Sequence, residues 1–245
     1  MRPLVAASFV CLTLIAPLRA DEFESLFNGK DLTGWNGDSK LWSVRDGAIV
    51  GTTDGKIPTN TFLIWDGTAG DFELHASFRM HGGNSGIQYR SKHVRDAGNF
   101  VVAGYQADMD AENVHTGILY EELGRGILAH RGEKVVIMPN GDKYVVGSTG
   151  DPKEVVASIN WDRWNDYVIV ASGNKLTQSI NGKTTIEVID HQANNRALDG
   201  ILALQLHKGH NMVVEFKDIR LKRLPAGKIV SPEETPIPPG AKKVR

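Results

Sequence analysis

The chain has 245 residues, of which 41% are apolar and 23% charged, and its formal charge is −1. A near-neutral balance without clusters of Lys and Arg argues against nucleic acid as a partner. After the N-terminal segment, no stretch approaches the roughly 18 consecutive apolar residues of a membrane-spanning helix.

Residues 1–20 have the pattern of a secretory signal peptide. Arg2 supplies a positive charge, residues 4–16 are almost wholly apolar, and Ala20 ends the run. Cys11, the only cysteine, lies in this segment, so the mature chain would have no disulfide and no thiol ligand. We therefore predict an exported protein, either periplasmic or secreted.

Short alternating segments separated by turns predict β-strands in residues 22–224. Every second residue of 72–80 is apolar, which is typical of a strand with one buried face. Residues 168–188 predict a meander with a tight hairpin at Asn181-Gly182. Residues 201–207 alternate again, and a bulge is expected at Lys217-Asp218 in the closing segment.

No long stretch has the helical period, and residues 192–198 would supply one helical turn at most. Many short antiparallel strands with polar outer faces predict an all-β fold, a two-sheet sandwich or jelly roll. From residue 225 to residue 245 the chain is proline-rich with few apolar residues. We predict an extended, largely disordered tail there.

Polar side chains recur at every second position in three predicted strands. Residues two apart share one face of a strand, so each pair projects away from the apolar residues between them. The pairs are Gln88 and Arg90, Gln106 and Asp108, and Gln205 and His207. Each strand thus presents an amide together with an ionisable group.

A curved sheet carrying such groups has the chemistry of a sugar-binding surface. Amides and guanidinium groups satisfy pairs of hydroxyls, and aromatic rings such as Tyr105, Tyr120 and Trp161 can stack on a sugar ring. The alternative is that these faces are ordinary solvated outer faces. The repeated amide favours a carbohydrate site, because outer faces usually carry Lys, Glu and Thr.

Other candidate motifs give weaker evidence of a functional site. Glu121-Glu122 follows Tyr120, so one of the two carboxylates must point opposite the tyrosine. That carboxylate could act as a general acid or base, or it could belong to a solvated strand end. His207-x-x-His210 has a spacing found in metal sites, but no third ligand is apparent. No cofactor is predicted, and a divalent ion stays an open alternative.

Several motifs together resemble the 3-keto-disaccharide hydrolase domain family. They cover residues 22–224 in the family's order, and only residues 125–150 do not align. The motifs are LFNGKDLTGW at 26–35, SGIQYR at 85–90, GYQAD at 104–108, LYEE at 119–122 and GILALQLH at 200–207.

This resemblance implies a concanavalin A-like jelly roll, the lectin and glucanase type of sandwich, in an exported protein. It also implies cleavage of glycosides that are oxidised to a ketone at C3. The ketone acidifies the hydrogen at C2, so a base can remove it, the C1 substituent leaves, and water adds back. Such a site needs a base, a donor for the enolate oxygen and an acid for the leaving group.

We assign these roles as a hypothesis. His207 or Asp108 is the base. Arg90, with Gln88 or Gln106, holds the developing oxyanion.

The remaining roles concern the leaving group and substrate binding. Glu121 or Tyr120 assists the leaving oxygen, while Gln205 and Tyr105 complete the substrate contacts. Direct hydrolysis by two carboxylates, Asp108 with Glu121 or Glu122, stays open. A carbohydrate-binding module without catalysis is the competing function. Passive binding has less need of the ionisable triad Arg90, Asp108 and His207, which we predict to converge in one hollow.

Overall fold

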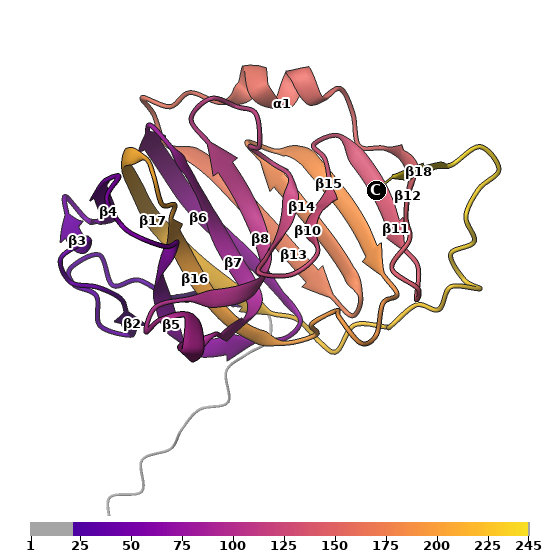
Figure 1. Ribbon diagram of the computed structural model, residues 1–245, viewed down its shortest axis with the longest axis horizontal. Coiled ribbons are helices and arrows are strands. Elements are labelled where there is room, and N and C mark those ends of the chain that lie inside the picture. The colour runs from indigo at the N-terminus through magenta and orange to yellow at the C-terminus, as the bar shows by residue number, and fades with distance from the viewer. Residues whose placement is uncertain (1–21, 245) are drawn as a thin grey trace, which may run out of the picture.

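The computed structural model describes residues 22–244 of the chain. The predicted signal peptide at residues 1–20, with Cys11, lies outside the described residues. Two β-sheets pack face to face, and helix α1 (Pro152–Ser158) lies at one end of them (Figure 1). The prediction of an all-β, two-sheet sandwich is confirmed.

The larger sheet has eleven strands. In spatial order these are β18 (Lys242–Val244), β12 (Lys143–Ser148), β11 (Glu133–Ile137), β15 (Lys183–Asp190), β14 (Lys175–Ile180), β13 (Asn165–Ser172), β6 (Phe72–His81), β17 (Asn211–Arg223), β4 (Ala48–Asp54) and β3 (Trp42–Arg45), with β1 (Glu24–Ser25) paired to β17. Its strand pairs are antiparallel except for β11 and β15, which run parallel. Residues 125–150, which do not align with the family that the sequence resembles, supply β11 and β12 of this sheet.

The smaller sheet has seven strands, all antiparallel to their neighbours. In spatial order these are β10 (Gly126–Ala129), β9 (Leu119–Glu122), β8 (Val102–Asp110), β7 (Asn84–His93), β16 (Gly200–Leu206), β5 (Thr61–Ala69) and β2 (Trp35–Asn36). A 3₁₀ turn, η1 (Arg95–Ala97), follows β7. The polar pairs predicted from the sequence belong to β7, β8 and β16, the central strands of this sheet, except that His207 directly follows β16.

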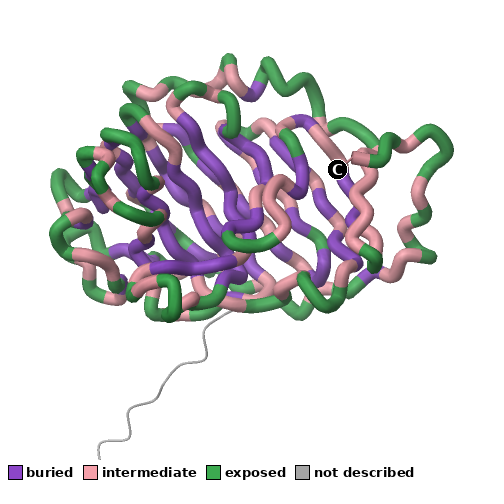
Figure 2. Tube along the Cα trace, viewed as in Figure 1, coloured by how far each residue is buried: buried purple, intermediate pink, exposed green. Residues whose placement is uncertain are grey.

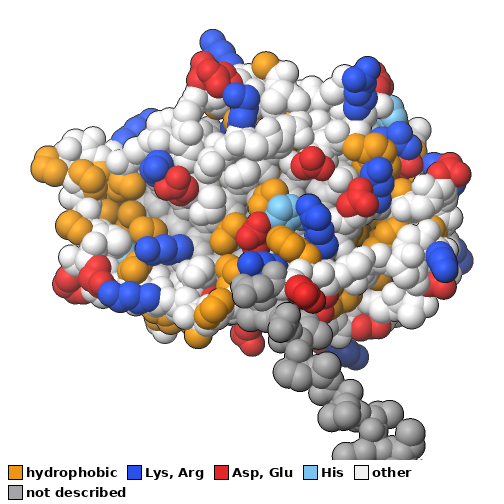
Figure 3. Space-filling model, turned by 180° about the vertical axis from the view of Figure 1, so that it is seen from behind, with side chains coloured by type: hydrophobic (Ala, Val, Ile, Leu, Met, Phe, Trp, Pro, Cys, Tyr) orange, Lys and Arg blue, Asp and Glu red, His pale blue; other side chains and the backbone are white. Residues whose placement is uncertain are grey.

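The core lies between the two sheets, where the buried segments of Figure 2 concentrate. The alternation predicted for residues 72–80 is confirmed, since Phe72, Leu74 and Phe78 are at most 1% exposed. Burying apolar surface is the main stabilising contribution to such a sandwich. On the face seen in Figure 3, Lys and Arg side chains are interspersed with Asp and Glu.

Two local predictions are confirmed and one element was missed. Asn181 and Gly182 both have positive φ, as a tight hairpin turn between β14 and β15 requires. The register of β17 against β6 shifts after Lys217, where Asp218 also has positive φ, so the predicted bulge is present. Helix α1 was not predicted, although Asp151 caps it by accepting a hydrogen bond from the Lys153 amide, 2.8 Å.

Residues 225–244 differ from the disordered tail that the composition predicts. The segment is extended, but it lies against the sandwich and ends in β18, which pairs with β12. Val230 is buried, and its amide and carbonyl both bond to the Asn174 side chain, at 3.0 and 3.1 Å. These backbone contacts fix a proline-rich segment that buries little apolar surface of its own.

Candidate active site

The outer face of the seven-stranded sheet carries the polar residues predicted from strand parity. On β8, Gln106 and Asp108 project outward, while Tyr105, Ala107 and Met109 join the core. The two faces of one strand therefore separate the chemistry from the packing.

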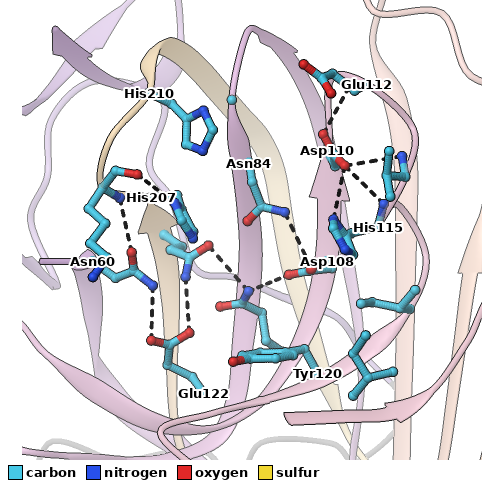
Figure 4. Close-up of a pocket in the computed structure, with 17 residues that line it drawn as sticks. Asn60, Asn84, Asp108, Asp110, Glu112, His115, Tyr120, Glu122, His207 and His210 are labelled. Atoms are coloured by element: carbon cyan, nitrogen blue, oxygen red, sulfur yellow. Dashed lines mark hydrogen bonds and ion pairs between the residues drawn. The ribbon is translucent and has the colours of Figure 1, made fainter. Parts of the chain in front are cut away.

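A pocket of about 550 Å³ opens on this outer face, and Figure 4 shows the side chains that line it. The lining includes four predicted residues on β8, β9 and β16, and His207 directly after β16. The full lining is Asn60, Gly83, Asn84, Gln106, Asp108, Asp110, Glu112, Val114, His115, Ile118, Tyr120, Glu122, Ile127, Gln205, His207, Lys208 and His210.

A chain of amide hydrogen bonds crosses the floor of the pocket (Figure 4). Gln106 Nε2 donates to Asp108 Oδ1 and to Gln205 Oε1, the latter at 3.3 Å. Gln88, which lies beside the pocket and does not line it, donates Nε2 to Gln106 Oε1 at 2.8 Å. Both ends of the Gln106 amide are therefore engaged, and its orientation is fixed.

Glu122 is another carboxylate that lines the pocket. Its oxygens accept from Asn60 Nδ2 at 3.0 Å and from Gln205 Nε2 at 3.4 Å. The backbone amide of Lys208 donates to Asn60 Oδ1 at 3.0 Å, which holds the asparagine in place. Burial raises the pKa of Glu122 above its usual value, against the hydrogen bond from Asn60.

Asp108 is the most strongly perturbed carboxyl group of the pocket. Burial raises the pKa of Asp108 to about 8, because removal from water penalises the carboxylate more than hydrogen bonds from Gln106 and Asn84 stabilise it. The nearby Glu122 contributes in the same direction. At neutral pH this group is mostly protonated, so it can donate a proton.

His207, in contrast to Asp108, is arranged to accept a proton. Its Nδ1 lies 2.7 Å from the carbonyl oxygen of Lys208, and since a carbonyl only accepts, Nδ1 must carry the hydrogen. Nε2 then carries the lone pair in the neutral ring. Burial lowers the pKa of His207, so the ring is neutral at pH 7 and Nε2 can accept a proton.

A loop after β8 forms the rim. The Asp110 carboxylate accepts from the backbone amides of Glu112, Val114 and His115, at 3.0 to 3.2 Å. Arg131 donates to the carbonyl oxygens of residues 113 and 116 from the other side. The loop is therefore held at both ends and presents a defined edge to the pocket.

Arg90 does not lie in the pocket, so its predicted convergence with Asp108 and His207 is wrong. Its backbone has φ 46°, and the register of β7 against β8 shifts between residues 89 and 92, which turns the side chain off the outer face. The Arg90 side chain is 1% exposed. It donates to the carbonyls of Gly70 and Gly173 and pairs with Asp71 at 2.9 Å.

Glu121 and Tyr105 also lie outside the pocket. Arg125 binds the Glu121 carboxylate at 2.6 Å and also pairs with Asp190, which accepts a hydrogen bond from the Tyr105 hydroxyl at 2.7 Å. These residues form a buried ionic network. Trp161, the third candidate for stacking, packs beside Phe78 of the core.

Several lining residues were missed, and only some of them could have been found. Asn84 lies four residues before Gln88, and Asp110 lies two residues after Asp108. The strand period of two therefore places both on the outer face, and it could have predicted them. Asn60 precedes β5, whose outward residues, including Phe62, form a small apolar cluster. The alternation along β5 therefore gives no sign that Asn60 lies at a polar site. Lys208 and His115 are in loops, which have no such period.

Residues 22–244 contain no cluster of three His, Cys, Asp or Glu side chains arranged to hold a metal ion. His207 and His210 lie with their ring centroids 5.2 Å apart. Among the described residues, no helix has the length and apolar character needed to cross a membrane.

The fold and the site define a jelly-roll protein with a pocket rich in carboxyl, amide and imidazole side chains on the outer face of its smaller sheet. The chain belongs to the 3-keto-alpha-glucoside-1,2-lyase-like domain family, whose sequence profile matches residues 22–222. This membership makes it a carbohydrate-related protein, as the sequence motifs predicted.

Solved structures share the fold at low sequence identity. Two candidate glycosyl hydrolases from Parabacteroides distasonis ATCC 8503 match with TM-scores of 0.56 and 0.55 at 18% and 19% identity. The first match covers 83% of this chain and 100% of the other, and the second covers 84% and 95%. The carbohydrate-binding module CBM66 from Bacillus subtilis matches at 0.52 and 14%, covering 77% and 95%. No curated protein matches the sequence.

Proposed function

We propose that the chain cleaves 3-keto-α-glucosides by elimination across C1 and C2, followed by addition of water. The observation that carries this proposal is the pairing of Asp108 and His207 in one pocket. Asp108 has a pKa raised to about 8 by burial, and His207 is a neutral imidazole with Nε2 free. An acid and a base with these protonation states suit general catalysis near neutral pH.

The bond changes follow from the ketone. His207 Nε2 takes the proton from C2, and the electron pair of the C2–H bond moves into an enolate that the C3 ketone stabilises. The enolate then re-forms the ketone as C1–C2 becomes a double bond and the C1–O bond breaks. Asp108 gives its proton to the departing oxygen, and water later adds across the double bond to yield the 3-keto sugar.

Tyr120 takes the role first assigned to Arg90. Tyr120 lines the pocket, and burial with the nearby Glu122 raises the pKa of Tyr120, so its hydroxyl stays a hydrogen-bond donor. A donor aimed at the enolate oxygen stabilises the charge that develops there. The amide chain from Gln106 to Gln205 holds the two carboxylates while the sugar lies above them.

Turnover of a matched pair of substrates tests the proposal. We expect methyl 3-keto-α-glucoside to give methanol and 3-keto-glucose, with the transient unsaturated ketone seen by its ultraviolet absorbance. Methyl α-glucoside is expected to remain intact, because without the ketone the C2 hydrogen is not acidic. Cleavage of both at similar rates would instead indicate direct hydrolysis by Asp108 and Glu122.

The pH dependence of kcat/KM is expected to be bell-shaped. The rate rises with pH as His207 loses its proton, at a pKa that burial lowers below the usual 6.5, and falls as Asp108 ionises at about 8. His207→Ala should keep only the falling limb, and Asp108→Asn only the rising limb. If His207→Ala kept a rising limb near pH 8, Asp108 would be the base.

Carbohydrate binding without catalysis is the second candidate function, favoured by the likeness to a carbohydrate-binding module. Binding of methyl 3-keto-α-glucoside in calorimetry, with no product formed, would support that function and exclude ours.

We also propose that the chain is exported, on the basis of the apolar run at residues 4–16. N-terminal sequencing of the protein from its native host should find the mature chain beginning within a few residues of position 21. A mature chain that retains residues 1–20 would contradict this.

A further inference from the structure

The acid and the base of the pocket come from strands that are not neighbours. Asp108 belongs to β8 and His207 follows β16, and β7 runs between these two strands. Neighbouring strands are about 4.8 Å apart, so roughly 10 Å of sheet separates the two groups, which leaves room for one sugar ring between them. Figure 4 shows Asp108 and His207 on either side of Asn84 from β7. In an α-glucoside the C1–O and C2–H bonds lie on opposite faces of the ring, which suits an acid and a base on opposite sides.

The exposed rim of the pocket begins beside Asp108. The loop that follows β8 returns to this residue, whose carbonyl oxygen accepts from the Gly117 amide at 2.9 Å. Val114 of the loop lines the pocket and is 61% exposed, whereas Gln106 and Gln205 on the floor are at most 1% exposed. A leaving alcohol held at Asp108 therefore lies against the exposed edge, and it can depart while the ring stays over the buried amides.

Asp108 is also the carboxyl group best placed to meet a hydroxyl that enters at C1. Its Oδ2 lies 3.5 Å from Asn84 Nδ2, at the outer limit of a hydrogen bond, so this oxygen stays available to another donor. In contrast, both oxygens of Glu122 accept from side-chain amides, and the Asp110 carboxylate accepts from three backbone amides. Glu112 lies on the exposed rim.

We infer a further activity for this pocket, the transfer of the 3-keto-glucosyl group to a second alcohol in place of water, with the α configuration kept. This inference rests on the proposed function. After the first alcohol has left over the rim, the unsaturated ketone remains between Asp108 and His207. The second alcohol then enters at the position that the first has vacated.

Each bond change of the transfer reverses one of the elimination. Asp108 has become a carboxylate by giving up its proton, and its raised pKa makes that carboxylate an effective base. It takes the O–H proton of the second alcohol while the alcohol oxygen bonds to C1, and the electron pair of the C1–C2 double bond moves into the enolate. The imidazolium of His207 then returns a proton to C2, and the C3 ketone re-forms. Since the oxygen comes from the side of Asp108 and the proton from the side of His207, C1 and C2 regain the configuration of the substrate.

The test uses 4-nitrophenyl 3-keto-α-glucoside as the donor and methanol as the second alcohol. We expect methyl 3-keto-α-glucoside as a new product, identified by NMR before it is cleaved in turn. Nitrophenolate leaves without a proton, so Asp108→Asn should still release it, accumulate the unsaturated ketone, and form the methyl glycoside about 10²-fold more slowly or less. Glu121→Gln changes a carboxyl group outside the pocket and should give the wild-type proportions of methyl glycoside and free sugar.

The products distinguish this inference from the proposed function. A mixture of α and β methyl glycosides, an equal yield without protein, or no methyl glycoside from a donor that is cleaved would overturn the inference alone. Undiminished capture of methanol by Asp108→Asn would also overturn it, because another group, such as Glu112, would then activate the alcohol. A donor that stays intact with the wild-type protein would overturn both.

Discussion

Asp108→Asn is expected to lower kcat/KM for methyl 3-keto-α-glucoside by about 10²- to 10⁴-fold, since methoxide is a poor leaving group without a proton. The same variant should lose only about tenfold or less with the 4-nitrophenyl compound, because nitrophenolate leaves unprotonated. His207→Ala should slow both substrates by about 10²-fold or more, as the base acts before the leaving group departs. Initial rates for two variants on two substrates check this.

Glu121→Gln is the control for these variants. Glu121 is 7% exposed and Asp108 is 5% exposed, so both changes replace a buried carboxyl group by an amide of the same shape. The Glu121 variant loses contacts with Arg125, and we expect it to unfold more easily while the folded protein keeps kcat/KM within about threefold of wild type. An Asp108→Asn protein equally slow with both leaving groups would show that Asp108 is not the acid.

Strand parity explains why part of this site was predictable. A period of two places Gln106 with Asp108 and Tyr120 with Glu122 on the pocket side, wherever the strands run regularly. The same alternation puts Glu121 on the other face of β9. Once Tyr120 is placed at the site, parity therefore predicts Glu122 rather than Glu121 as the carboxylate beside it.

The alternation of side chains along a strand fails at Arg90. A bulge shifts the face on which the following residues project, and its usual sequence signal is a glycine with positive φ. Here the residue with φ 46° is Arg90 itself, which gives no such signal. The polarity of the side chain matched an outer face, but its hydrogen-bonding capacity is satisfied by buried carbonyls.

Gly86 shows a different limit. In the sequence it is one glycine within SGIQYR, without an evident reason. In the structure a Cβ at Gly86 would lie 2.5 Å from Gln106 Cγ, so only glycine lets the Gln106 side chain lie across β7 toward Gln205. The parallel pairing of β11 with β15 is likewise a long-range choice that local periodicity does not encode.

Arg90→Leu is expected to destabilise the fold and leave the chemistry intact. Removing the guanidinium leaves Asp71 without its buried cation and two carbonyls without donors, which should lower the free energy of unfolding by about 3–5 kcal/mol. Asp71 also accepts from the amides of Gly173 and Gly227, so the start of the C-terminal segment should loosen. Urea unfolding followed by tryptophan fluorescence measures the change.

Arg79→Leu is the matched control, because Arg79 also pairs with a carboxylate, Glu215 at 2.6 Å, but is 34% exposed. Solvent screens that pair, so we expect a loss of about 1 kcal/mol or less. Both variants should retain wild-type kcat/KM without denaturant, because neither arginine lines the pocket. If Arg90→Leu instead kept its stability and lost activity, Arg90 would have to reach the substrate, and the pocket described by Asp108 and His207 would be incomplete.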